Sequence, residues 1–198
     1  MAFYSQEELA GLGLNRFGKD VRISKKVSIY NPGKISIGNH VRIDDFCVLS
    51  AGEGGIEIGD YVHIAVYCSL IGTGKITMAD FSGLSSRVAI YSSNDDYSGE
   101  HLTNPTVPGK YAGTMHADVY IDKHTIIGAG SIVLPGVRLE IGTAVGALSL
   151  VKKNSSAFGI YFGAPARRVG DRSRRLLELE TLLRNETAEA EQSNGRNE

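Results

Sequence analysis

The chain has 198 residues, a formal net charge of −1 with its histidines neutral, 24 glycines and two cysteines. This length suits one domain with a buried core, and the near-neutral charge gives no basic field of the kind that nucleic acids or anionic membranes require. We expect no nucleic-acid partner and no membrane span, since no apolar run approaches the roughly 18 residues of a spanning helix. With no charged-then-apolar leader in the sequence, we expect a cytoplasmic protein.

The first 20 residues precede the regular part of the chain. Ser5 and Glu8 have the spacing of a capping box, which predicts a short helix that Gly11 and Gly13 end. We assign residues 1–20 as an N-terminal cap segment.

A six-residue period in aliphatic residues governs residues 21–155. It is clearest in the run Ile121, Ile127, Val133, Leu139, Val145 and Val151. A helix would repeat near 3.6 residues and a two-sided strand at 2, so this period, with glycines between, predicts a hexapeptide β-helix. Three six-residue sides make one coil of roughly 18 residues, whose aliphatic side chains stack on those of the next coil about 4.8 Å away.

The same period begins near Ile23, with insertions at AGEGG (51–55) and IGTGK (71–75). Glycines there allow the corners to bulge, and we count about five to six coils. Cys47 and Cys68 each fall four residues after an inward aliphatic residue. We therefore expect both thiols to pack inside, not to bind zinc or form a disulfide.

The repeat is interrupted by a loop at residues 91–120, which is rich in Asn, Asp, His and Tyr. An insertion of this length inside a compact domain is usually functional, and its polar content suits a polar ligand. Its tyrosines and prolines argue against plain disorder.

Residues 156–198 follow the last expected coil as an exit segment and a helix. The Gly/Pro-rich stretch 156–170 is expected to leave the coil, and residues 171–192 to form an amphipathic helix. Its apolar face comprises Leu176, Leu179, Leu182 and Leu183. We expect this face to pack on the coil exterior or on a trimer partner.

Residues 20–170 resemble the hexapeptide-repeat acyltransferases. The resemblance lies in IIGAGSIVLPGV (126–137), VGALSLVKK (145–153) and FGAPARRV (162–169), the last similar to the Gly-x-Pro-Ala-Arg ending of acetyl-CoA-dependent members. It implies an all-β fold, a left-handed parallel β-helix with a long inserted loop and a C-terminal helix. It also implies a homotrimer with active sites at the subunit interfaces, where the loop of one subunit meets the coil face of its neighbour.

The loop sequence SSNDDYSGEHLTNPTVP (92–108) is similar to that of acyltransferases of dTDP-linked 4-amino-4,6-dideoxyhexoses. This closer resemblance implies acetyl transfer from acetyl-CoA to a nucleotide-linked amino-deoxysugar in surface polysaccharide (O-antigen) biosynthesis. The sugar amine would attack the thioester directly. The alternative is an O-acetyltransferase that acts on a sugar hydroxyl, as galactoside-type enzymes do.

The resemblance places the catalytic histidine position of galactoside-type enzymes at Asp95. A hydroxyl needs a base of near-neutral pKa, usually His, whereas an amine needs only a group that takes its proton after attack. A carboxylate also attracts an ammonium group, so Asp95 favours an amine acceptor. His116, at the loop exit, is the second candidate. Expected substrate contacts are Asn94, Asp96, Tyr97 and His101.

The resemblance also implies a coenzyme A site. The backbone of Ala129 and Ala147 would contact the pantetheine arm, and Gly128 and Gly146 would permit its close approach. A basic cluster would meet the nucleotide phosphates, and its members are Lys152, Lys153, Arg167 and Arg168. The alternative for this cluster is a solvated patch of charge. No metal site is expected.

Two hypotheses from other classes remain. A metal hydratase similar to the γ-class carbonic anhydrases would need three converging histidines, for which His101, His116 and His124 are available in a context unlike that family. The simpler expectation is that His124 is structural or exposed and that His40 and His63 lie on the surface. A non-catalytic scaffold would need neither the 91–120 loop nor the FGAPARRV ending. Bound metal would indicate the hydratase. Failure to bind coenzyme A would indicate the scaffold.

Overall fold

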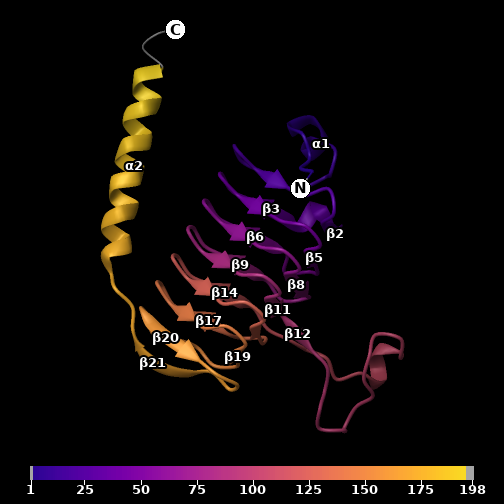
Figure 1. Ribbon diagram of the computed structural model, residues 1–198. Helices are drawn as coiled ribbons and strands as arrows, with labels where there is room; N and C mark the ends of the chain where they lie inside the picture. The colour runs from indigo at the N-terminus through magenta and orange to yellow at the C-terminus, as the bar shows by residue number, and fades with distance from the viewer. Residues whose placement is uncertain (1, 195–198) are drawn as a thin grey trace.

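The computed structural model describes residues 2–194 and confirms the predicted all-β fold, a parallel β-helix with an inserted loop and a C-terminal helix (Figure 1). Three sheets form the sides of the β-helix, and neighbouring strands of each sheet come from successive coils, except for a final antiparallel pair in the third sheet. The β-helix has about seven coils, more than the five to six expected.

The first sheet contains β3 (Ile35–Ile37), β6 (Ile56–Ile58), β9 (Ile76–Met78), β14 (Val119–Ile121) and β17 (Arg138–Leu139). The second contains β2 (Ser28–Tyr30), β5 (Val48–Ala51), β8 (Ser69–Gly72), β11 (Ala89–Tyr91), β16 (Ile132–Val133) and β19 (Leu150–Val151). The third contains β1 (Arg22–Ile23), β4 (Arg42–Ile43), β7 (His63–Ile64), β10 (Gly83–Leu84), β15 (Ile126–Ile127), β18 (Ala144–Val145), β20 (Gly159–Phe162) and β21 (Arg167–Asp171). Short 3₁₀ helices cover Pro32–Lys34 and Gly109–Tyr111.

Inward side chains form one aliphatic column beneath each sheet. In the third sheet, for example, parallel pairing brings Ile43, Ile64, Leu84 and Ile127 into register, and all four are buried. Burial of each such side chain contributes about 1.5–3 kcal/mol, which one hexapeptide cannot obtain without neighbours. Both cysteines occupy the small inward slot as predicted and are fully buried.

Helix α1 (Gln6–Ala10) caps the N-terminal end of these columns. The predicted capping box is confirmed, because Ser5 Oγ accepts from the N–H of Glu8 and the Glu8 carboxylate accepts from the N–H of Ser5. Leu9 is fully buried and belongs to the core cluster. The short helix therefore shields the first coil from water.

One corner of the β-helix consists of residues in the left-handed backbone region. His40, Tyr61, Phe81 and His124 have φ between 55° and 60° and stack ring on ring, with centroids 4.6, 4.8 and 5.1 Å apart. This conformation costs a non-glycine residue about 1–2 kcal/mol, and aromatic stacking returns about 0.5–1.5 kcal/mol per pair. His124 is 8% exposed and structural, as expected.

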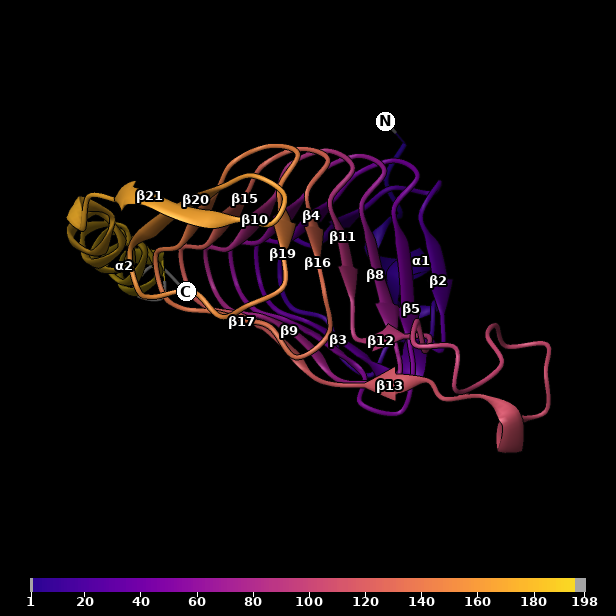
Figure 2. The same ribbon diagram turned by 90° about the horizontal axis from the view of Figure 1, so that it is seen from below.

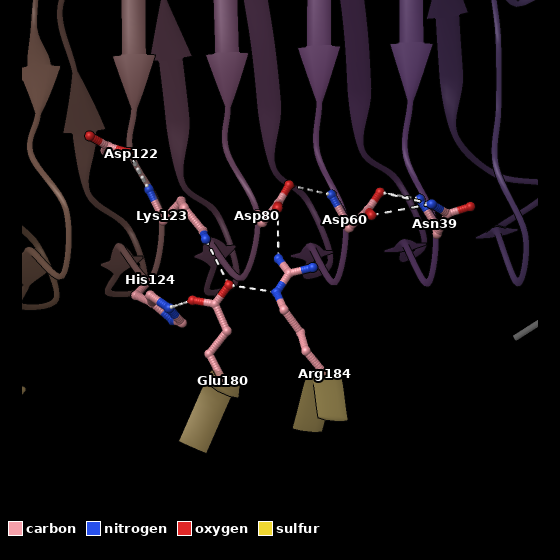
Figure 3. Close-up of polar contacts among 8 residues, drawn as sticks. All are labelled: Asn39, Asp60, Asp80, Asp122, Lys123, His124, Glu180 and Arg184. Carbon is pink, nitrogen blue, oxygen red and sulfur yellow. Dashed lines mark hydrogen bonds and ion pairs between the residues drawn. The ribbon is translucent and has the colours of Figure 1, made fainter. Parts of the chain in front are cut away.

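The residues that precede this stack form a ladder of hydrogen bonds between coils (Figure 3). The N–H of Asn39 donates to Asp60 Oδ1 (2.7 Å), and the N–H of Asp60 donates to Asp80 Oδ1 (3.0 Å). A Cβ at Gly38 or Gly59 would overlap these same carboxylate oxygens. The glycine before each rung is therefore required by the side chain of the next coil.

The end of the β-helix differs from the expected exit at residues 156–170. Strand β20 adds to β18 in parallel as one more strand of the third sheet, and β21 then returns antiparallel to β20. The pairing of Val145 with Tyr161 steps by 161 − 145 = 16 residues, where Ile127 to Val145 steps by 145 − 127 = 18. The aliphatic period is lost here because the coil is shorter, while the stack of strands continues.

Helix α2 (Arg175–Asn194) begins after β21 and runs back along the β-helix toward its N-terminal coils (Figure 1). It lies on the opposite side of the β-helix from the inserted loop (Figure 2). Its hydrogen bonds and ion pairs with the coils involve Glu180 and Arg184, and Arg184 also lies over the ring of Phe81, whereas Leu179 and Leu182 are 52% and 56% exposed. Within this chain, three of the four residues predicted for the apolar face, Leu179, Leu182 and Leu183, stay exposed, whereas Leu176 is partly buried. Neither helix within residues 2–194 has the length and apolar character that crossing a bilayer needs.

Glu180 is the centre of the contact between α2 and the coils (Figure 3). Its carboxylate accepts hydrogen bonds from Lys123 Nζ (2.7 Å), His124 Nε2 (2.6 Å) and Arg184 Nε (2.8 Å), and Arg184 also reaches Asp80 (3.1 Å). Burial opposes ionisation of Glu180, but these donors outweigh burial and lower the pKa of the carboxyl from 4.5 to about 2. Because the folded pKa lies below the unfolded one, the stabilisation is fully present above pH 4.5 and is lost as the pH falls through about 2.

We predict that Glu180→Gln loosens α2 at neutral pH, because the cationic donors lose their carboxylate in a mostly buried site at a cost of about 2 kcal/mol. Amide hydrogen exchange of residues 176–189 should accelerate about 10-fold or more. Glu178→Gln, an exposed change on the same helix, is the matched control and should exchange like the parent. Identical exchange in the Glu180→Gln variant and the parent would contradict the assigned role of Glu180.

Candidate functional site

A cleft of about 840 Å³ lies on the outer face of the second sheet, at the base of the inserted loop. This volume is typical of small-molecule sites. Its floor is formed by outward side chains of successive coils, namely Ser50, Ile71, Tyr91, Ile132 and Leu150. Its wall includes four of the residues predicted from the sequence, Asn94, Asp95, Tyr97 and His116. The floor was not predicted, although its members are all outward residues next to the inward residue of their strands.

The loop leaves and re-enters the β-helix through a two-stranded stem, β12 (Ser93–Asn94) and β13 (Met115–His116), paired antiparallel. Ser92, directly before the stem, is fully buried: its N–H donates to the Ile71 carbonyl (3.0 Å) and its Oγ to the Gly74 carbonyl (2.7 Å). Gly72 has φ 144°, and a Cβ there would overlap Ser92 Oγ. The glycines of IGTGK therefore seat the loop stem on β8.

His116 is held by the stem. It pairs with Ser93 across the two strands, and its Nδ1 lies 2.8 Å from Ser93 Oγ. The N–H of Thr73 donates to the same Ser93 oxygen at 2.7 Å. Sequence reasoning did not identify Ser93 or Thr73 as site residues, because nothing in the hexapeptide period relates residue 73 to the loop.

Asp95 follows β12 directly and is exposed in the cleft wall. In the part of the chain that the structure describes, its carboxylate has no hydrogen-bond or ion-pair partner, so it is available to a ligand. The two residues predicted to be catalytic, Asp95 and His116, thus share one wall. Asn94 lies between them in the stem and pairs with Met115.

Asp96 and His101 do not line the cleft. The Asp96 carboxylate accepts hydrogen bonds from the N–H and Oγ of Ser98 (2.8 and 2.9 Å) and from the N–H and Nδ1 of His101 (both 3.1 Å). These donors, the Ser98 N–H foremost, lower the pKa of Asp96 from 3.8 to about 2. Both residues organise the loop itself, which projects away from its own β-helix (Figures 1 and 2). Their contact with a substrate stays a prediction.

The four basic residues predicted for a phosphate site come together. Lys152, Lys153, Arg167 and Arg168 line a second hollow of about 360 Å³ near the last coil. Strand β19 contributes to both hollows, because Leu150 lines the cleft and Val151, directly before Lys152, lines the second hollow. Several cations around one hollow suit a polyphosphate group.

Ala129 and Ala147 are exposed at the corner between the third and second sheets, on consecutive coils. Within residues 2–194 neither backbone N–H meets an internal acceptor, so both are free to bind a ligand amide. A Cβ at Gly128 would overlap the backbone of Ala147, and a Cβ at Gly146 would overlap the ring of Phe162. The immediate reason for these two glycines is therefore close packing between coils.

Within one subunit, the three histidines considered for a metal site have separate partners. His124 binds Glu180, His101 binds Asp96 and His116 binds Ser93. Within residues 2–194, histidine, cysteine, aspartate and glutamate side chains form no group of three or more that suits a metal ion.

Comparison with known proteins gives close relatives. No family model matches the chain. It is 53% identical over 184 residues to dTDP-4-amino-4,6-dideoxy-D-glucose acyltransferase of Escherichia coli, which covers 93% of this chain and 96% of that protein. The structure is similar to a serine-to-cysteine variant of AntD, an N-acyltransferase from Bacillus cereus, in complex with dTDP-4-amino-4,6-dideoxyglucose and coenzyme A. For this pair the TM-score is 0.90 and the identity 48%, over 93% of this chain and 98% of that one.

A second AntD structure, in complex with dTDP and 3-hydroxybutyryl-CoA, gives a TM-score of 0.91 at 48% identity, over 95% of this chain and 100% of that one. A maltose O-acetyltransferase from Clostridium difficile is 18% identical with a TM-score of 0.56, over 85% of this chain and 75% of that one. This last likeness concerns the fold alone.

We predict that Gly72→Ala displaces the loop stem, because the new Cβ meets Ser92 Oγ and the backbone holds a φ that favours glycine. The expected cost is about 2–4 kcal/mol, measured by thermal unfolding, with faster proteolysis of residues 95–114. Gly109→Ala is the matched control, since a Cβ there has open space. A Gly72→Ala variant whose loop resists protease like the parent would show that the stem does not depend on this glycine.

Proposed function

This chain belongs to the hexapeptide β-helix acyltransferase family that includes dTDP-4-amino-4,6-dideoxy-D-glucose acyltransferase, and we propose that it acylates the amine of a dTDP-linked 4-amino-4,6-dideoxyhexose with acetyl-CoA as donor. The observation that carries the proposal is the cleft at the loop base. Asp95, an unpartnered carboxylate, stands in its wall. Strand β19 borders both this cleft and the basic hollow.

The basic hollow and the neighbouring corner are the proposed coenzyme A site. Lys152, Lys153, Arg167 and Arg168 would bind the nucleotide phosphates by charge-assisted hydrogen bonds. The free N–H groups of Ala129 and Ala147 would bind the amides of the pantetheine arm, which leads toward the cleft floor at Ile132 and Leu150. The thioester would then lie at the loop base.

In the proposed reaction the neutral sugar amine attacks the thioester carbonyl carbon. A C–N bond forms, the C–S bond breaks, and coenzyme A leaves as the thiolate, which is then protonated. The surplus proton on the nitrogen passes to Asp95, whose negative charge also attracts the amine in its ammonium form. Asn94 and Tyr97 are the proposed contacts to the sugar in the same wall.

We propose that the enzyme is a homotrimer with active sites at the subunit interfaces. The corner between the second and third sheets exposes Phe46, Tyr67 and Leu148, the last by 77%, and apolar surface of this kind marks contact sites. The loop projects from its own β-helix (Figure 2), and in a trimer its residues, Asp96 and His101 among them, would meet the cleft of a neighbouring subunit. We assign the enzyme to the cytoplasm, where acetyl-CoA is made, and to surface polysaccharide (O-antigen) biosynthesis.

The first test is thiol release from acetyl-CoA with a panel of acceptors. We expect release with dTDP-4-amino-4,6-dideoxyglucose and little with UDP-linked amino sugars, dTDP-glucose or galactosides. Release only with hydroxyl acceptors would show that the enzyme is an O-acetyltransferase. Binding of coenzyme A without turnover of any acceptor would show that the proposed acceptor is wrong. S-acetylpantetheine, which lacks the nucleotide phosphates, should show a raised KM if the basic hollow binds them.

Asp95→Asn should lower kcat about 100-fold or more, because the amide keeps the shape of the carboxylate but cannot take the proton. Coenzyme A affinity, measured by calorimetry, should stay within about 2-fold of the parent value. Glu100→Gln, an exposed acid in the same loop, is the control for a general effect of loop charge. Near-normal turnover by Asp95→Asn would remove this residue from the proton transfer.

A further inference from the structure

We infer that His116 acts in the cleft as a hydrogen-bond donor through Nε2 and not as a base, and that Ser93 is the positioning residue that fixes it in this role. The chain of contacts Thr73–Ser93–His116 carries the inference. The identity of the group that receives the hydrogen bond rests on the proposed function, whereas the tautomer of the ring does not.

The backbone N–H of Thr73 sets the direction of the hydrogen bonds from Thr73 to Ser93 and from Ser93 to His116. A backbone N–H only donates, so the N–H of Thr73 makes Ser93 Oγ an acceptor at 2.7 Å. The serine hydroxyl still has its own hydrogen to place. Among the described residues, the acceptor within its reach is His116 Nδ1, at 2.8 Å.

This direction sets the tautomer of His116. If Nδ1 accepts from Ser93, the neutral ring carries its hydrogen on Nε2. Nε2 has no partner within residues 2–194, and the residue lines the cleft, so an N–H is available to a ligand. A general base would need a lone pair at that nitrogen, which this tautomer lacks.

The chain of contacts is held rigidly. Ser93 and His116 are paired across the stem, and the preceding Ser92 is fully buried against Gly72 and Gly74. Thr73 lies between those two glycines, so its N–H has a fixed place relative to the stem. The histidine is therefore pre-oriented before any ligand arrives, which lowers the entropy cost of the bond it makes.

The ligand group that such a donor recognises is an oxygen of the nucleotide sugar, either a sugar hydroxyl or a diphosphate oxygen. The attacking amine is not that group, since its lone pair is directed at the thioester. Asp95, in the same wall, is left as the proton acceptor. In this arrangement Asp95 accepts the proton, and His116 holds the acceptor sugar in place for attack.

The ring state can be measured directly in the ligand-free protein by long-range ¹H–¹⁵N NMR of histidine-labelled samples, with His116→Gln used to assign the signal. We expect the Nε2–H tautomer in the parent and loss of that preference in Ser93→Ala. A neutral ring with its hydrogen on Nδ1 in the parent would overturn the inference. This outcome is independent of turnover, so it separates failure of the inference from failure of the proposed function.

Kinetics supply the second test, because a glutamine side chain places an N–H donor near the position of histidine Nε2. His116→Ala should raise the KM for the amino sugar about 10-fold, and His116→Gln should recover most of that loss. The acidic limb of the pH profile of kcat/KM should be the same in His116→Gln and the parent. The other titratable groups that line the cleft are Asp95, Tyr91 and Tyr97. If both variants lose kcat about 100-fold and the limb shifts, His116 is a base.

Inhibition by dTDP distinguishes the two kinds of oxygen. A larger inhibition constant for dTDP in the His116→Ala variant than in the parent would place the contact at the diphosphate. Unchanged inhibition together with a raised KM for the amino sugar would place it at a sugar hydroxyl. If His116→Ala changes neither the inhibition constant for dTDP nor the KM for the amino sugar, His116 makes no contact with the acceptor.

Discussion

The parallel, in-register stacking of coils is the constraint on which the rest of this structure depends. Because each strand pairs with its equivalent in the next coil, a residue at any position lies directly above its counterpart. Inward positions become aliphatic columns, corner positions become the ring stack from His40 to His124, and outward positions of the second sheet become the cleft floor. Every feature of the surface is therefore extended along the axis unless something interrupts the stack.

Chemistry of the kind proposed needs different polar groups at one point, which a uniform column does not provide. The interruption at residues 91–120 supplies them. The stem of the loop is seated where Gly72 and Gly74 leave no side chain in the way, and it presents Asp95 and His116 over the apolar floor. A regular scaffold thus gives position and rigidity, and one irregular segment gives the polar groups of the cleft wall.

The parts of this structure that repeat were predictable from sequence. The six-residue period identified the inward columns, and Ser5 with Glu8 identified the first helix. The basic cluster was expected from the resemblance of VGALSLVKK and FGAPARRV to acyltransferase motifs, and its four members do line one hollow. The last strands were missed because the coil at Phe158 is shorter than 18 residues, so the pattern fades while pairing continues. The pairs Thr73 with Ser93 and Asp96 with His101 depend on how the loop folds, which no periodicity describes.

The position of α2 has a mechanical consequence. Arg184 binds Asp80, in the coil before the insertion, while Glu180 binds Lys123 and His124, in the coil after it. The stack of Phe81 on His124 spans the same junction. A repeat protein behaves as a one-dimensional array that comes apart at its weakest interface, and a long insertion is where such an interface is expected. The helix clamps that junction from the side opposite the loop, so its ion pairs join the coils on the two sides of the insertion and offset the weakness that an insertion brings to the array.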